Sequence, residues 1–231
     1  KWAIEELNFE DLIQGTDINP DNSKPYPFCL AYPLEKKPEE LGEVEEWQVE
    51  YKWDGIRGQF IKRNNEVFIW SRGEELVNAQ FPELVAAFEK MEGNFVLDGE
   101  ILAVADNEVL NFNELQKRLN RKTISAKMMK EIPINTFVYD ILEYESEDLR
   151  EKPLVERRLL LEKLIENSEL ENIKISEVII AKSWEELAEV REKSRENNSE
   201  NLMLKQKNSH YKKKKKKGDW WKWKVDALTI D

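Results

Sequence analysis

The chain has 231 residues, of which 40% are hydrophobic and 36% are charged, and its formal net charge is −11. A chain of this length can bury an ample core, and its single cysteine, Cys29, excludes an internal disulfide framework. Its single histidine, His210, argues against a His-based metal site or a Ser-His-Asp triad. No apolar run approaches the roughly 20 residues of a membrane span. We therefore expect a monomeric, intracellular protein of a reducing, cytoplasmic compartment with no membrane partner.

The N-terminal part of the sequence is poor in strand signals. Residues 1–24 predict a short amphipathic helix followed by a polar linker, and the N-terminus is too acidic for a signal peptide. Residues 25–43 are punctuated by proline and are expected to wrap the edge of a domain. We predict that residues 25–231 form one domain.

A β-rich block begins at residue 47. Residues 47–53 predict a strand whose alternation separates two faces. One face carries Trp47, Val49 and Tyr51, and the other carries Gln48, Glu50 and Lys52. Residues 57–63 and 66–71 predict a hairpin, because Asn64-Asn65 between them suits a two-residue turn.

Lys52 stands at the end of the first of these strands, directly before the turn at Asp54-Gly55. Such a position can hold an amine in a fixed direction for a chemical role. The alternative is an ordinary surface lysine on an edge strand. This stretch alone leaves both interpretations open.

The rest of the chain alternates helical and strand patterns. Residues 94–104 read as two strand halves around Asp98-Gly99, and Ser183 and Glu186 are spaced as a capping box. Helices are predicted for residues 81–91, 111–119, 125–132, 153–167 and 184–197, and strands for residues 135–144, 201–207 and 220–230. Antiparallel strands with peripheral helices predict an α+β fold.

The lysines are unevenly distributed. Between Lys205 and Lys224 there are ten lysines and one acidic residue, Asp219, so the rest of the chain carries the negative excess. A basic segment on an acidic body indicates a phosphate-binding face. The run Lys212–Lys217, taken alone, is typical of a solvated loop.

Charged residues recur at the ends of the predicted strands, on the same side as their polar neighbours. Each one alone is common on an amphipathic strand. Together they could hold a polyphosphate and a divalent cation against a nucleophilic amine. The set comprises Lys52, Arg57, Arg72, Asp98, Glu100, Glu200, Lys205, Lys222 and Lys224.

The stretch KWDGIR, residues 52–57, resembles the first motif of the covalent nucleotidyltransferases, Lys-x-Asp-Gly-x-Arg. This superfamily comprises DNA ligases, RNA ligases and mRNA capping enzymes. SRGEE, LDGE, FVYDIL, ENLMLK and WWKWK follow in the order and rough spacing of its other nucleotide-binding motifs. Over residues 25–231 the chain most resembles the ATP-dependent DNA ligases of bacteria and archaea. The resemblance implies an adenylation domain with an antiparallel-sheet, ATP-grasp-like nucleotidyltransferase fold.

The resemblance also implies a role for each motif residue. Lys52 would attack the α-phosphate of ATP, form a lysine–AMP adduct and release pyrophosphate. The AMP would then pass to the 5′-phosphate of a nick in double-stranded DNA. The implied ATP contacts are Glu50 at the adenine amino group, Tyr139 stacked on adenine, Arg57 and Arg72 at ribose and phosphate, and Lys222 and Lys224 at the α-phosphate. Glu100 and Glu200 would hold Mg²⁺ or ribose hydroxyls.

The chain departs from the family pattern in three ways. The fourth motif usually carries Glu-Gly, whereas this chain has Glu200-Asn201, and Asn is the residue next most tolerant of positive φ. Lys215 falls about where relatives carry an arginine in the nucleotide site, and lysine cannot form a bidentate fork. The N-terminal DNA-binding domain and the OB domain of such ligases do not fit into 231 residues. Reduced activity is one expectation from these departures.

Alternatives remain at this point. The chain could be an RNA ligase or a capping-type guanylyltransferase, or a catalytically silent domain that binds nucleotide or nicked DNA. Tyr139 could be a core residue, since Phe137 and Ile141 share its face of the predicted strand. The tryptophans at 220, 221 and 223 are expected to serve packing and strand pairing.

Overall fold

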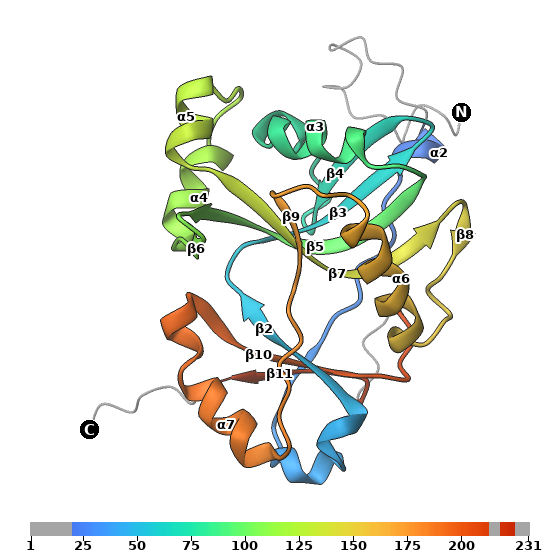
Figure 1. Ribbon diagram of the computed structural model, residues 1–231, viewed down its shortest axis with the longest axis vertical. Helices are drawn as coiled ribbons and strands as arrows, with labels where there is room; N and C mark the ends of the chain where they lie inside the picture. The colour runs from blue at the N-terminus through green and yellow to red at the C-terminus, as the bar shows by residue number, and fades with distance from the viewer. Residues whose placement is uncertain (1–19, 213–217, 225–231) are drawn as a thin grey trace.

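The computed structural model describes residues 20–212 and 218–224. These residues form two β-sheets, one above the other in Figure 1, with helices on their outer sides. Lys215, the predicted helix before residue 20 and the predicted strand beyond Lys224 lie outside the described residues. No helix in the described ranges is both long and apolar enough to cross a membrane.

The larger sheet has seven strands in the order β4-β3-β5-β7-β8, with β6 on β5 and β9 on β7. Its pairs are antiparallel except for β7 with β9. The strands are β3 (Ile56–Arg63), β4 (Glu66–Ser71), β5 (Phe95–Ala105), β6 (Glu108–Val109), β7 (Ile134–Tyr144), β8 (Glu147–Asp148) and β9 (Ile173–Ile175).

The smaller sheet has four strands in the order β1-β11-β10-β2, and only its short edge strand β1 runs parallel to its neighbour. The strands are β1 (Tyr32–Pro33), β2 (Trp47–Trp53), β10 (Ser199–Gln206) and β11 (Trp220–Lys224). The chain passes from this sheet to the larger one at the turn between β2 and β3.

Short helices cover the outer faces of both sheets (Figure 1). The α-helices are α2 (Pro20–Ser23), α3 (Pro82–Lys90), α4 (Phe112–Leu119), α5 (Ala126–Glu131), α6 (Leu154–Glu166) and α7 (Trp184–Glu192). The 3-10 helices are η1 (Pro38–Leu41), η2 (Val44–Glu46), η3 (Asn78–Gln80) and η4 (Ser194–Asn197). The mixture of antiparallel sheet and peripheral helices confirms the predicted α+β class.

Local chemistry explains the tight turns of the larger sheet. The predicted hairpin turn at Asn64-Asn65 has positive φ at both residues, 51° and 64°. The turns at Asp106-Asn107 and Glu145-Ser146 have the same left-handed pair. Two left-handed central residues match the twist of a two-residue hairpin, and the Asn and Asp residues of the first two turns tolerate that conformation better than most residues.

Three local predictions are wrong. Residues 95–105 form one continuous strand, so Asp98 and Glu100 lie in mid-strand rather than at a strand end. The helix predicted for residues 184–197 ends at Glu192, because the chain turns into the 3-10 helix η4. Ser183 accepts a hydrogen bond from the amide of Glu186, but the Glu186 carboxylate accepts from Lys182 rather than closing the box on Ser183.

Candidate functional site

The strand register of the smaller sheet gathers the charged motif residues on one face. Glu50 pairs with Met203 and Lys52 pairs with Asn201, while Lys222 lies on the far side of Met203. The opposite face carries the residues of an apolar cluster that also includes the α7 side chains Trp184 and Leu187: Trp47, Val49, Leu202, Leu204, Trp221 and Trp223. The alternation predicted for residues 47–53 is therefore confirmed for Trp47 and Val49, while Tyr51 packs against the same cluster and also lines the cavity described next.

A cavity of about 150 Å³ lies where this charged face meets the larger sheet. Seven of the ten residues predicted to bind ATP line it: Glu50, Lys52, Arg57, Arg72, Glu100, Tyr139 and Lys222. Lys205, which the sequence placed in the charged set without an ATP contact, also lines it, and six lining residues were not predicted as site residues: Leu30, Ala31, Tyr51, Trp53, Met203 and Trp220. Trp220 thus differs from the expectation of packing and strand pairing alone, whereas Trp221 and Trp223 meet it.

Lys52 lines the cavity with a partly exposed side chain, and its ammonium contacts the Glu200 carboxylate. A bulge in β10 aims Glu200 in this direction. Ser199 pairs with Trp53 and Asn201 pairs with Lys52, so Glu200 is the extra residue between two consecutive positions of β2. An extra residue bends a strand and redirects its side chain.

Burial makes the Lys52 amine easier to deprotonate than a free lysine. Burial lowers the pKa of Lys52, and the charges of Lys222 and Lys224 act in the same direction. The carboxylates of Glu100 and Asp54 oppose this shift. A neutral amine is the nucleophilic form of lysine.

Gly55 explains why the turn after Lys52 can lie against β5. A Cβ at this position would come within 2.3 Å of the backbone oxygen of Ile101. Any side chain would therefore push the turn away from the larger sheet. The glycine of the KWDGIR motif thus keeps Lys52 at the junction of the two sheets.

Arg57 is held by a buried acidic residue of β5. Its Nε and Nη2 donate to the two oxygens of Asp98 at 3.1 and 2.7 Å, and its Nη1 donates to the backbone oxygen of Cys29 at 2.7 Å. Tyr211 and Tyr139 also donate to Asp98, at 2.6 and 3.2 Å. Burial alone would lower the pKa of Arg57, but the charge of Asp98 outweighs it and raises that pKa well above its ordinary value. Arg57 is therefore a fixed cation in the cavity wall.

Glu100 and Glu200 do not form a ready metal site by themselves. Burial raises the pKa of Glu100 to about 8, although Arg57 and Lys52 act in the opposite direction. The described parts of the chain contain no group of three or more acidic, His or Cys side chains that could hold a metal ion. Mg²⁺ often takes only one or two protein carboxylates, with substrate phosphates and waters completing its shell. The two glutamates fit an ion of that kind only together with a bound phosphate.

Tyr139 lies outside the alternation that made it a candidate core residue. Asp98 pairs with Asp140 and Gly99 pairs with Val138, so Tyr139 is the extra residue of a bulge in β7. Val138 and Ile141 join the core, whereas Tyr139 lines the cavity. The core alternative for Tyr139 is therefore wrong, and its stacking on a base stays a prediction.

Arg72 lines the cavity, whereas Lys224 and Asn201 are not among its lining residues. Arg72 is exposed and directly follows β4, and its amide donates to the backbone oxygen of Arg57 at 3.0 Å. Lys224 is exposed at the end of β11. Asn201 is buried in β10 and is not among the residues with positive φ. The expectation that this position relies on left-handed tolerance is wrong, because the bulge at Glu200 supplies the bend.

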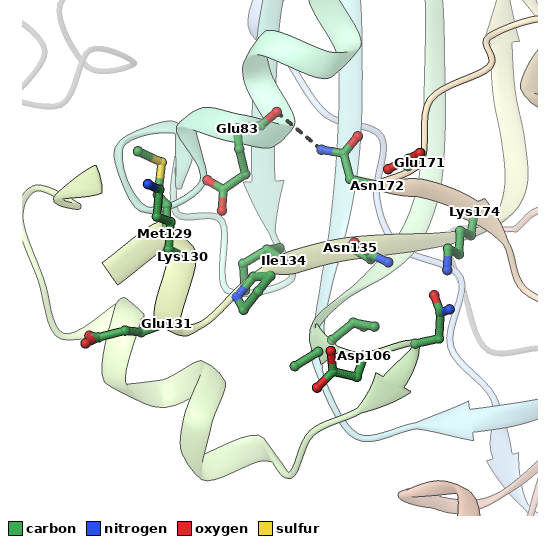
Figure 2. A pocket seen from close by; sticks show the side chains of 14 residues that line it. Glu83, Asp106, Met129, Lys130, Glu131, Ile134, Asn135, Glu171, Asn172 and Lys174 are labelled. Carbon is green, nitrogen blue, oxygen red and sulfur yellow. Dashed lines mark hydrogen bonds between the residues drawn. The ribbon is translucent and has the colours of Figure 1, made fainter. Parts of the chain in front are cut away.

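A larger hollow of about 940 Å³ lies away from these residues (Figure 2). Figure 2 shows Asp106, Glu131, Asn135 and Lys174 around it, and none of the predicted site residues lines it. One of its acidic lining residues, Glu83, is already paired with the buried Arg118. Volume alone therefore does not identify the functional site of this protein.

Comparison with known proteins identifies a protein family that matches this chain. The family described as "ATP dependent DNA ligase domain" matches residues 29–224. A "Probable DNA ligase" of Koribacter versatilis (strain Ellin345) is 41% identical over 138 residues, which cover 60% of this chain and 24% of that protein. A "DNA ligase" of Acidianus ambivalens is 35% identical over 197 residues, which cover 83% of this chain and 32% of that protein. The chain thus spans about a quarter to a third of the length of these curated relatives.

Solved structures share the fold. "Mycobacterial DNA ligase D complexed with ATP and MES" has a TM-score of 0.66 and 23% identity, and the match covers 85% of this chain and 60% of that one. "ATP-dependent DNA ligase from bacteriophage T7 complex with ATP" has a TM-score of 0.63 and 21% identity, covering 88% and 69%. The predicted nucleotidyltransferase fold of a ligase adenylation domain is confirmed.

Proposed function

This chain belongs to the family of ATP-dependent DNA ligase domains, and we propose that it binds ATP between its two sheets and forms a covalent AMP adduct on Lys52. The convergence of motif residues from β2, β3, β5, β7 and β11 on one cavity carries the proposal. These residues are far apart in sequence, so it is the fold that brings them together around one cavity. Two relatives in solved structures are described as complexed with ATP.

The cavity suits the base end of the nucleotide. Its volume of about 150 Å³ is below the roughly 300–1,000 Å³ of pockets that enclose a whole ligand. Adenine would lie inside, with its amino group at Glu50 and its ring against Tyr139. The phosphates would then lie at the mouth, where Lys52, Arg72 and Lys222 meet.

Lys52 is the proposed nucleophile. The lone pair of its neutral amine attacks the α-phosphorus, the new N–P bond forms, and the bond to the bridging oxygen breaks to release pyrophosphate, while the nitrogen loses one proton to solvent. Lys222 and Lys224 stabilise the negative charge that develops on the α-phosphate. The Glu200 carboxylate must give up its contact with Lys52 before the attack.

We propose Mg²⁺ as the metal partner of ATP, with Glu100 and Glu200 as its protein ligands. The ion would neutralise charge on the phosphates. Glu200 contacts Lys52, and Glu100 lines the same cavity as Lys52, so both carboxylates are near the proposed position of the α-phosphate. Lys215 stays a proposed phosphate contact on sequence grounds.

The second half of the reaction extends the proposal beyond this chain. The AMP would pass from Lys52 to the 5′-phosphate of a nick in double-stranded DNA. Because the chain spans only part of its relatives, a DNA-binding domain and an OB domain would complete the DNA-bound enzyme. We expect residues 25–231 to act as the adenylation domain of a monomeric, intracellular ligase in DNA replication, repair and recombination.

Intact mass spectrometry after incubation with ATP and Mg²⁺ tests the first step. One AMP should be added to the wild-type chain, and Lys52→Ala should add none while keeping its fold. An adduct that persists in Lys52→Ala would assign the nucleophile to another residue. Labelling by GTP instead of ATP would indicate capping-type chemistry. Transfer of AMP to nicked RNA rather than DNA would indicate an RNA ligase. The absence of any adduct on the wild-type chain would indicate a catalytically silent domain.

A further inference from the structure

The most buried part of the cavity wall contains an ion pair. Glu50 and Lys205 are only 1% and 2% exposed, and both line the cavity. The Lys205 ammonium donates to Oε1 of Glu50 at 2.8 Å, and Gln48 donates to the same oxygen at 2.7 Å. Oε1 carries both bonds, and no bond to Oε2 is recorded among the described residues.

The surroundings of Lys205 hold its ammonium in place. Its Nζ lies 4.1 Å from the ring centre of Tyr139 and 5.0 Å from that of Trp220. An ammonium has three donors, so one reaches Glu50 and the others face electron-rich rings. Two aromatic walls and one carboxylate therefore fix this cation from three elements: β2, β7 and β11.

Stability does not explain this pair. A buried ion pair loses the hydration of both charges, and apolar residues of similar size are often equally stable or more so. The pair instead fixes the hydrogen-bonding role of Glu50, because an ionised carboxylate only accepts hydrogen bonds whereas a protonated one also donates. By donating to Oε1, Lys205 holds Glu50 as a hydrogen-bond acceptor where a bound base would lie.

We propose that Lys205 is a positioning residue that sets nucleotide choice by holding Glu50 as a fixed hydrogen-bond acceptor. The cavity would then select a purine that presents an amino donor to Glu50 over a purine that presents an oxo acceptor to Glu50. This inference rests on the proposed function, which places the base in the cavity. Lys205 touches no reacting atom. It acts through Glu50.

Lys205→Met tests the inference, with Lys205→Arg as the charge-conserving variant and the exposed Lys163→Met as the matched control. Trp53 and Trp220 line the cavity, so tryptophan fluorescence can report ATP and GTP binding directly. Lys205→Met should weaken ATP binding about tenfold or more, because Glu50 keeps only the Gln48 amide and loses its cationic partner. Its preference for ATP over GTP should shrink by a similar factor. Lys205→Arg should recover most of the preference, and Lys163→Met should match wild type.

Adenylation kinetics give a second readout. Lys205→Met should raise the KM for ATP more than it lowers kcat, because Lys52 and Lys222 are unchanged. If Lys205→Met does not fold, Glu50→Gln/Lys205→Met removes both charges, and its neutral amide can donate as well as accept. That variant should also lose preference for ATP. An unchanged ATP-to-GTP ratio in either folded variant overturns the inference. A wild-type chain that binds ATP without forming an adduct defeats the proposed function, while the binding ratio still decides the role of Lys205.

Discussion

The two faces of the four-stranded sheet differ although the same three strands build both. One face packs apolar side chains against α7, where Leu202 and Leu204 are fully buried. The other carries Glu50, Lys52 and Lys205 toward the larger sheet, and the first and last of these are as buried as a core residue. Because successive side chains of a strand point to opposite faces, neighbouring residues contribute to these two different surfaces.

This difference separates the residues that stabilise the protein from those that do chemistry. Burial of apolar area drives folding, whereas burial of charge costs free energy unless each group is paired. On the cavity face Lys205 is paired with Glu50, and across the cavity, in the larger sheet, Arg57 is paired with Asp98. Substitutions on the apolar face should therefore mainly lower stability, whereas substitutions on the cavity face should mainly slow adenylation.

On the apolar face, Leu204→Ala should have the largest effect on stability. Its side chain is 0% exposed, so truncation should lower the free energy of unfolding by about 2–5 kcal/mol. Adenylation by the folded fraction should stay close to wild type. Urea denaturation and a single-turnover assay measure the two quantities, with the exposed Leu159→Ala as control. A large loss of rate in folded Leu204→Ala would show that the two faces are coupled.

On the cavity face, Lys222→Ala should show the reverse pattern. Loss of one electrostatic contact to a developing charge typically slows the step by about 10²–10³. Stability should change by less than about 1 kcal/mol, because the side chain is only half-buried. Lys163→Ala, a lysine exposed on α6, is the control for loss of charge. Equal rates in the two variants would remove Lys222 from the site.

A smaller effect is expected where this chain departs from its family. Asn201→Gly restores the residue usual in the fourth motif, but Asn201 has no positive φ to relieve. Glycine in a strand interior should lower stability by about 0.5–1 kcal/mol, with the adenylation rate nearly unchanged. The same denaturation and single-turnover assays apply. A clear gain in rate would mean that the bulge at Glu200 needs backbone freedom after all.

The smallest effect concerns a polar cluster that belongs to neither face. Tyr26 donates to Glu143 at 2.6 Å, and burial, together with this carboxylate, raises the pKa of Tyr26 to about 12. The unfolded tyrosine ionises near pH 10, so the stability that the cluster contributes below that pH is lost as the pH rises from about 10 to 12. Tyr26→Phe should flatten this part of the stability curve, measured by denaturation across that range, and leave adenylation unchanged near neutral pH. A curve as steep as wild type would contradict the assignment.

Much of the local structure and most of the site membership could be predicted from sequence. Alternation in residues 47–53 separated the two faces, and Asn64-Asn65 located a hairpin turn. The order of six motifs named the residues that converge on the cavity. These features can be predicted because their sequence signals are local. A period of two, a left-handed turn residue or a short run of charges can be recognised within a few positions.

Other features became visible only in three dimensions. The bulges at Glu200 and Tyr139 turn those side chains, yet no nearby residue marks either as an extra residue. Lys205 was visible in its motif as a strand lysine, but its partner Glu50 lies 155 residues earlier.

The physical reason is that a local pattern sets which way a side chain points from its own strand, and nothing more. What it then meets depends on how distant strands register and how the two sheets pack. Sequence thus determined the elements, their faces and the candidate residues. Tertiary structure alone decided that Asp98 would clamp Arg57 and that a lysine would hold Glu50 at the end of a cavity.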